Sequence, residues 1–284
     1  MLVLDLDGTL LNRAGHVSAG NRAAIARARQ HGLEVIVATG RALVESTGPL
    51  AEIGEQKLIV AAGGSLLCDV PTRATLRRRV MPRGLVDEVT TALLGHGHKV
   101  LILKDADAAG YDYLAVGDGP LDPASAWWFE AMQSTVRFVA DLADDPHPHD
   151  TIRIGVVASG GELAPIARQL KARLGDRAFM QHWPAVTSTH AIGSATHLLE
   201  VFNPDVNKWT MIAEYCAMRG IAPARVASIG DGLNDVEMLR ESGLGVAMAN
   251  ASASARQAAD RLTVADHDGD GAAEAIGRIL SGEW

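Results

Sequence analysis

The sequence has few cysteines and no excess of positive charge. Its 284 residues include only two cysteines, Cys68 and Cys216, which lie far apart. This argues against a disulfide framework and predicts a reduced, cytoplasmic setting. The net charge of −8 and the lack of a basic tract argue against a nucleic-acid partner. No apolar run reaches the roughly 18 residues of a membrane span, so no membrane partner is expected. An anionic substrate would have to be met by local positive charge or by a metal ion.

The beginning of the chain alternates strand and helix patterns. Leu2–Leu4 predicts a buried strand because its apolar run is continuous. Ser18 can cap a helix that ends near Gly32. Further strands are expected over 33–38 and 58–61. Strand, helix and strand at this spacing form βαβ units, which predict a parallel sheet covered on both faces.

The middle of the chain has a different pattern. Short runs that alternate polar and apolar residues indicate antiparallel strands with one wet face, at 99–103, 111–116, 136–139 and 152–157. Helical patterns lie near 84–95 and 161–174, and the segment 141-DLADDPHPHD-150 is expected to be a solvated loop. These features predict a small α+β insert.

The strand and helix alternation returns from about residue 196, with a helix over Asn207–Arg219 and strands over Arg225–Ile229 and Leu244–Met248. Hydrophobic residues make up 48% of the chain, which suffices for a sizeable core. We therefore expect an α/β protein with two domains. A Rossmann-like, doubly wound parallel sheet forms the core over 1–82 and 188–284, and the α+β insert covers 83–187.

Four aspartates follow the ends of predicted parallel strands. Asp5 and Asp7 come directly after the first strand, and Asp231 and Asp235 lie in 230-GDGLND-235 after a later one. Ligand sites in open parallel sheets gather outside the carboxyl ends of the strands, so these carboxylates are expected to converge. Like charges at this density repel one another, and a hard divalent cation such as Mg²⁺ resolves the conflict. The sequence therefore predicts a magnesium site at these four residues.

The same arrangement favours phosphoryl transfer. Asp5 can attack phosphorus and form an aspartyl-phosphate, and Asp7, on the same side of the extended backbone, can act as general acid and base. Thr39 offers a hydroxyl and Gly40 a bare amide to the phosphoryl oxygens. Lys208 stands at a predicted helix start, where a cation is unfavourable unless it faces a phosphate.

Four stretches together resemble the motifs of the haloacid-dehalogenase superfamily: 5-DLDGTLL-11, 39-TGR-41, 207-NK-208 and 230-GDGLND-235. Two more, 245-GVAMANA-251 and 266-DHDGDGAAEAI-276, resemble its Cof-type branch. The position of the insert matches the type IIB cap of that family, a lid that selects substrate. Two places depart from the pattern: 60-VAAGGSLL-67, where relatives often carry Asn-Gly, and His267, where they often carry Asn.

The resemblance implies a role for each site residue. Asp5 is the nucleophile and Asp7 the acid and base, while Mg²⁺ is held by the side chains of Asp5 and Asp231 and the backbone carbonyl of Asp7. Asp235 supports the metal or orients Lys208. Phosphate is bound by Thr39, Gly40, Lys208 and Asn234, and Arg41 is assigned to phosphate, to the cap or to the charge at a helix start.

Three other groups of residues could each form a binding site, and each also has a simpler structural interpretation. The pairs His96/His98 and His147/His149 invite a transition-metal site but lie in loop-like sequence, which favours solvation. The segment 266-DHDGDG-271 starts like a calcium loop but lacks the closing glutamate, which favours a turn. Trp127-Trp128-Phe129 could stack on a sugar ring or pack in a core.

We expect a Mg²⁺-dependent phosphatase of a small phosphorylated metabolite, a sugar or polyol phosphate. A phosphosugar mutase and a non-catalytic sensor of a phosphorylated ligand are the alternatives. The sequence gives no indication of the oligomeric state or of which cap residues select the substrate.

Overall fold

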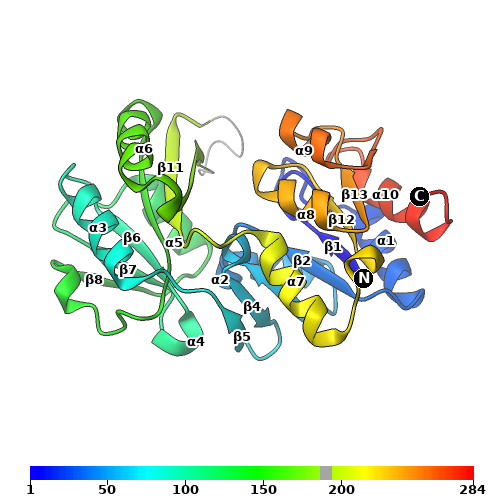
Figure 1. Ribbon diagram of the computed structural model, residues 1–284, viewed down its shortest axis with the longest axis horizontal. Coiled ribbons are helices and arrows are strands. Elements are labelled where there is room, and N and C mark those ends of the chain that lie inside the picture. Colours follow the sequence, from blue (N-terminus) through cyan, green and yellow to red (C-terminus); the bar gives the residue numbers. More distant parts are fainter. Residues whose placement is uncertain (186–193) are drawn as a thin grey trace. The chain divides into compact units, whose positions relative to one another are not determined.

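The computed structural model describes residues 1–185 and 194–284, and the chain divides into two compact units (Figure 1). Unit 1 comprises Met1–Arg77 and Asn207–Trp284, and unit 2 comprises Arg78–Val206. The expected boundary after residue 187 lies outside the described residues. Residues 196–202, which the sequence assigned to the core, instead form a strand of unit 2, because they pair with two strands of its sheet.

Unit 1 is built on an eight-stranded sheet in the order β14-β13-β12-β1-β2-β3-β4-β5 (Figure 1). The strands from β14 to β3 pair in parallel, which confirms the predicted α/β fold, whereas β4 pairs antiparallel with β3. The strands are β1 Leu2–Leu4, β2 Val35–Ala38, β3 Leu58–Ala61, β4 Leu66–Asp69, β5 Thr75–Arg78, β12 Ala227–Gly230, β13 Leu244–Ala247 and β14 Arg261–Leu262.

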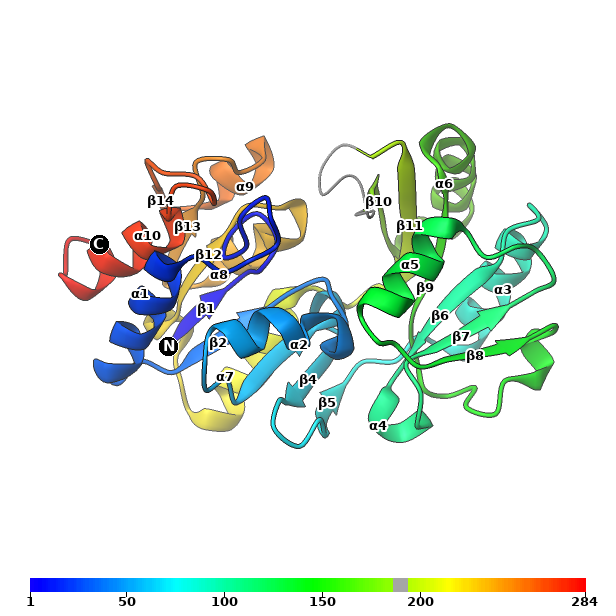
Figure 2. The ribbon, with the colours of Figure 1, turned by 180° about the vertical axis from the view of Figure 1, so that it is seen from behind.

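Helices cover both faces of this sheet. Figure 1 shows α7, α8 and α9 on one face, and Figure 2 shows α1, α2 and α10 on the other. Ser18 caps α1 as predicted, because its hydroxyl accepts the backbone N–H of Asn21 at 3.0 Å. The helices are α1 Ala19–Gln30, α2 Leu43–Glu52, α7 Lys208–Arg219, α8 Val236–Glu241, α9 Ala253–Ala258 and α10 Gly271–Leu280. Short 3₁₀ turns lie at η1 Ala62–Gly64 and η5 Leu233–Asp235.

Unit 2 contains a six-stranded sheet in the order β10-β11-β9-β6-β7-β8. Its pairs are antiparallel, as the alternating pattern predicted, except that β7 and β8 run parallel. The strands are β6 Val100–Lys104, β7 Tyr113–Val116, β8 Val136–Val139, β9 Thr151–Ser159, β10 Phe179–Pro184 and β11 Thr196–Phe202.

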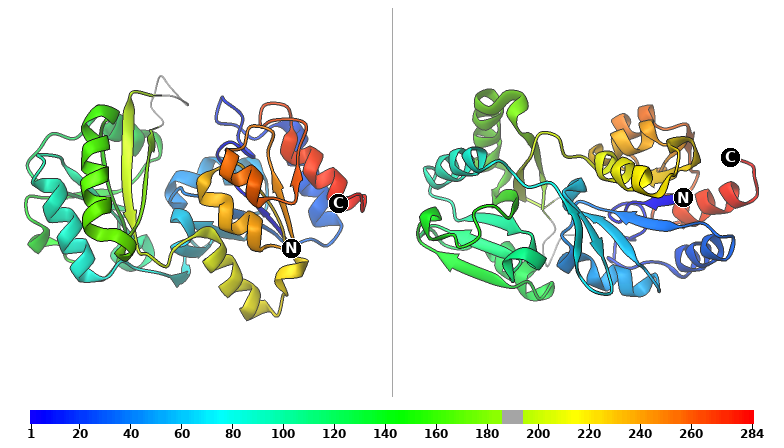
Figure 3. Two further views of the ribbon diagram at one scale, coloured as in Figure 1. Left: turned by 45° about the horizontal axis from the view of Figure 1, so that its top comes forward. Right: turned by 60° about the horizontal axis from the view of Figure 1, so that its bottom comes forward.

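Two long helices lie against the sheet of unit 2 (Figure 3). Apolar side chains of α3 and α6, such as Val89 and Leu163, share a buried cluster with Ile154 of β9. The helices of this unit are α3 Arg83–Leu94, α4 Ala106–Ala109, α5 Pro123–Ala131 and α6 Gly160–Leu174. Among residues 1–185 and 194–284, no helix is both long and apolar enough to cross a membrane.

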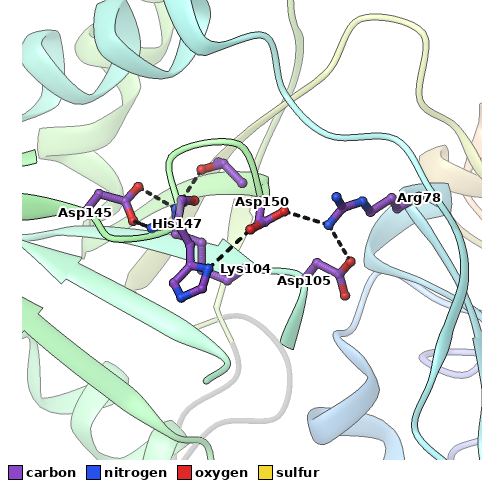
Figure 4. A network of polar contacts seen from close by, with 7 residues as sticks. Arg78, Lys104, Asp105, Asp145, His147 and Asp150 are labelled. Carbon is purple, nitrogen blue, oxygen red and sulfur yellow. Dashed lines mark hydrogen bonds and ion pairs between the residues drawn. The ribbon is translucent and has the colours of Figure 1, made fainter. Parts of the chain in front are cut away.

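A buried lysine, Lys104, binds the segment 141–150 (Figure 4). Lys104 Nζ lies 2.6 Å from Asp145 Oδ2, and both side chains are fully buried. The ammonium also donates to the carbonyl oxygen of His147 at 3.0 Å and to Thr151 Oγ1 at 2.9 Å. Most of this segment is exposed or half-buried, as expected for a solvated loop, and Lys104 anchors it at Asp145 and His147.

Candidate active site

Three carboxylates meet at the carboxyl end of the sheet of unit 1. Asp5 follows β1 and stays in register because its backbone N–H donates to the carbonyl oxygen of Ile229 in β12 at 3.0 Å. Asp231 follows β12, and Asp235 ends the turn η5. One carboxylate oxygen from each aspartate lies within 4.8 Å of the other two. Adjacent parallel strands bring these residues together, as expected for this class of sheet.

The ammonium of Lys208 lies among these carboxylates. Lys208 is the first residue of α7, which Asn207 caps by accepting the backbone N–H of Thr210 at 2.9 Å. Its fully buried Nζ lies 2.6 Å from Asp5 Oδ1 and 2.6 Å from Asp235 Oδ1. Burial opposes the charged form, but Asp235 and Asp5 outweigh it and raise the pKa of Lys208. Lys208 therefore remains charged.

A close backbone contact brings the start of α7 to this position. Gly64, at the end of η1, has φ of +105°, and a Cβ atom there would lie 2.1 Å from the carbonyl oxygen of Asn207. Only glycine permits this approach. The glycine-rich stretch at 60–67, which departs from the family pattern, thus contributes to placing Lys208.

The carboxylates carry more negative charge than Lys208 can neutralise. Burial, and then the charge of Asp235, raise the pKa of Asp5 well above its ordinary value. The same two causes raise the pKa of Asp231 to about 7. Three carboxylates against one ammonium leave an uncompensated negative charge that a divalent cation would neutralise. Oxygen ligands of this kind suit Mg²⁺, so the residues present fit the predicted metal.

The carboxylate of Asp7 does not join this group, which differs from the predicted convergence of four aspartates. Arg41 binds it through two contacts, from Nε to Oδ2 at 2.9 Å and from Nη2 to Oδ1 at 2.6 Å. Bidentate pairs of this kind fix both partners in orientation. The side chain of Asp7 is half exposed, whereas that of Arg41 is 15% exposed. The roles assigned to Asp7 and its backbone carbonyl stay predictions.

Three of the residues predicted to bind phosphate lie after the ends of β2 and β12. Thr39 is buried, and its hydroxyl accepts the backbone N–H of Arg41 at 3.1 Å. A Cβ atom on Gly40 would lie 3.6 Å from the side-chain nitrogen of Asn234, so these two residues are neighbours. The structure brings Thr39, Gly40 and Asn234 to one edge of the sheet, and phosphate binding there stays a prediction.

Two residues that the sequence did not single out hold Asp231. Thr9 Oγ1 donates to Asp231 Oδ1 at 3.2 Å, and Asn250 Nδ2 donates to Asp231 Oδ2 at 3.3 Å. Asp231 also packs against Gly8, where φ is +77° and a Cβ atom would lie 2.3 Å from the carboxylate. The only sign of this role in the sequence was the position of Asn250, which follows the strand predicted at Leu244–Met248.

Residues 267–270 form a turn, which the simpler interpretation of the segment 266–271 predicted. In the 266–271 segment, Asp266 accepts backbone N–H groups of its own turn and Asp268 pairs with Arg13 at 3.0 Å. His147 Nδ1 lies 3.3 Å from Asp150 Oδ2. Within the described part of the chain, no group of three or more side chains that could hold a metal includes either histidine pair.

Comparisons with known proteins point to one family of hydrolases. The family model described as haloacid dehalogenase-like hydrolase matches residues 2–276. A 5-amino-6-(5-phospho-D-ribitylamino)uracil phosphatase of Bacillus subtilis is 26% identical over 100% of this chain and 99% of its own length. A chloroplastic endoribonuclease of Arabidopsis thaliana is 27% identical over 96% of this chain, which spans 45% of that protein. The crystal structure of a haloacid dehalogenase-like hydrolase from Bacteroides thetaiotaomicron superposes with a TM-score of 0.77 at 26% identity, covering 98% of both chains.

Proposed function

Because the chain belongs to the haloacid dehalogenase-like hydrolase family, we propose that it is a Mg²⁺-dependent phosphatase of a small sugar or polyol phosphate. The observation that carries this proposal is the meeting of Asp5, Asp231 and Asp235 with the buried ammonium of Lys208 at the strand ends. Such a site combines a nucleophile, a place for a cation and a fixed positive charge. Phosphoryl transfer requires little more than this positioning and neutralisation.

The reaction proceeds in two displacements at phosphorus. An oxygen of Asp5 attacks the phosphorus atom and forms an aspartyl-phosphate, while the bond to the leaving alcohol breaks and the alkoxide takes a proton from Asp7. A water molecule then attacks the same phosphorus after giving its proton to Asp7, which releases phosphate and restores the Asp5 carboxylate.

The remaining residues bind the phosphoryl group. Thr39, Gly40 and Asn234 supply polar groups to its oxygens. Lys208, which also keeps the Asp5 carboxylate oriented by its contact at 2.6 Å, supplies positive charge to them. Asp5 and Asp231, supported by Asp235 and the backbone carbonyl of Asp7, would hold Mg²⁺. When bound, the ion supplies positive charge to the phosphoryl oxygens.

One observation supports the proposed substrate class, and a second supports a role for unit 2 in selecting the substrate. The Bacillus subtilis relative is named for a substrate that carries a phosphorylated ribityl chain, which is a polyol phosphate. Unit 2 is inserted between Arg77 and Asn207, where the resemblance places a substrate-selecting cap. We propose that unit 2 has this role and that unit 1 is the catalytic core.

A phosphate-release screen tests the proposal. Purified protein is incubated with a panel of hexose, pentose and polyol phosphates in Mg²⁺ and, separately, in EDTA, with Asp5→Asn as the matched inactive variant. We expect release with at least one compound, dependent on Mg²⁺ and absent in the variant. Measuring isomerised product in the same samples separates a phosphatase from a mutase. No release from any compound would contradict the proposal.

A further inference from the structure

Both oxygens of the Asp231 carboxylate accept hydrogen bonds from neighbouring side chains. The hydroxyl of Thr9 donates to Oδ1 at 3.2 Å, and the amide of Asn250 donates to Oδ2 at 3.3 Å. Thr9 is fully buried. Because each carboxylate oxygen has two lone pairs, one remains on each oxygen for a cation.

The amide of Asn250 can point only one way. Its Oδ1 accepts the backbone N–H of His267 at 3.1 Å, and a backbone N–H can only donate. Nδ2 must therefore face the opposite side, where it donates to the carbonyl oxygen of Gly8 at 2.8 Å as well as to Asp231. One side chain thus joins three segments that are distant in the sequence.

The backbone around Asn250 is fixed to the same strand end. The N–H of Met248 donates to the carbonyl oxygen of Gly230 at 3.0 Å, and the N–H of Ser252 donates to that of Asp231 at 2.9 Å. The turn from 248 to 252 is therefore bonded to residue 231 and to the residue before it. This places the Asn250 amide beside the carboxylate with little freedom to move.

We propose that Asn250, with Thr9, is a positioning residue for the metal site: it fixes the Asp231 carboxylate, and the chain at Gly8 directly after Asp7, so that this carboxylate and the Asp7 carbonyl meet one divalent cation. This inference rests on the proposed function, because it assumes that Asp231 binds the ion. Partners that orient metal ligands typically affect metal affinity by 10–100-fold when they are removed. A role confined to joining loops would affect stability without changing affinity for the ion.

The chain offers a matched control in Asn21. Its amide also joins distant segments, since Nδ2 donates to the carbonyl oxygen of Leu10 at 3.2 Å and Oδ1 accepts the N–H of Ala273 at 2.9 Å. These contacts tie α1 to α10 and involve none of the site carboxylates. Asn21→Ala therefore shows how the loss of a buried bridging amide outside the site changes the stability of the protein and its Kd for Mg²⁺.

Calorimetric titration with MgCl₂ tests the inference on the full-length protein. We expect the Kd for Mg²⁺ to rise about tenfold or more in Asn250→Ala and in Thr9→Val, and to stay near the wild-type value in Thr9→Ser and Asn21→Ala. Thr9→Val removes the hydroxyl at nearly constant shape, and Thr9→Ser restores it, so this pair gives an answer even if Asn250→Ala does not fold.

The outcomes separate the inference from the function on which it rests. If the wild type binds Mg²⁺ and both Asn250→Ala and Thr9→Val bind it equally well, the positioning role is refuted while the phosphatase stands. If the wild type shows no Mg²⁺ binding, the proposed metal site and this inference both fall.

Discussion

Replacing Lys208 by methionine tests how the carboxylate cluster is stabilised. The ammonium is fully buried and lies 2.6 Å from an oxygen of both Asp5 and Asp235. Removing one partner of a buried ion pair costs about 3–5 kcal/mol, because the charge left behind has no compensation. Asp5 and Asp235 can take up protons in response, which limits the loss, so we expect about 3 kcal/mol for Lys208→Met in metal-free protein at neutral pH.

Mg²⁺ should recover part of this loss, since the ion replaces the missing positive charge. Urea denaturation followed by circular dichroism, in EDTA and in excess MgCl₂, measures both quantities. Lys104→Met is the control: its ammonium is equally buried and lies 2.6 Å from Asp145, which belongs to unit 2 and is not one of the site carboxylates. We expect a comparable loss there that Mg²⁺ does not change. A loss below about 1 kcal/mol in Lys208→Met, or equal Mg²⁺ responses of the two variants, would refute the reasoning.

Three further predictions follow from individual residues. Asp5→Asn should abolish phosphate release and raise the metal-free melting temperature, because it removes one of three mutually repelling carboxylates; a variant that retains turnover contradicts its role as nucleophile. The pKa of Asp231, about 7 against an ordinary 3.8, means that the folded state binds this proton more tightly than the unfolded state does. The tighter binding of this proton therefore stabilises the folded state fully below pH 3.8, and the stabilisation is lost as the pH rises towards 7. Melting temperatures measured in EDTA should fall over that pH range, and bound Mg²⁺ should make them depend less on pH. Gln133, just after α5, has φ of +55°, so Gln133→Gly should stabilise the protein by about 1 kcal/mol in thermal denaturation, whereas Gln133→Ala should not.

The core of the fold could be predicted because its patterns are local. Continuous apolar runs mark β1 and β3, and the capping residue Ser18 marks the start of α1, all of which the structure contains. The pairing partner of a strand is not a local property. The apolar sequence of β11 gave no sign that it pairs with β9 in unit 2 rather than with a strand of the core. The charged and exposed β5 showed no strand pattern at all.

The site divides in the same way. Spacing after predicted strands placed Asp5, Asp231 and Asp235 correctly at one sheet edge. It could not show that Arg41 binds the Asp7 carboxylate, because that contact depends on the conformation of two side chains. Nor could it assign a role to Asn250 within the 245–251 stretch, because the three partners of that side chain come from segments that meet only in the folded chain.

The most direct test asks which residue receives the phosphoryl group. Asp7→Asn should slow hydrolysis of the intermediate, since the water would lack its base, and so let phosphorylated protein accumulate on mixing with an active substrate. Rapid quenching and peptide mass spectrometry then locate the modification. We expect it on Asp5, with none in Asp5→Asn. A phosphoryl group on any other residue, or turnover with no phosphorylated protein at any time point, would contradict the mechanism.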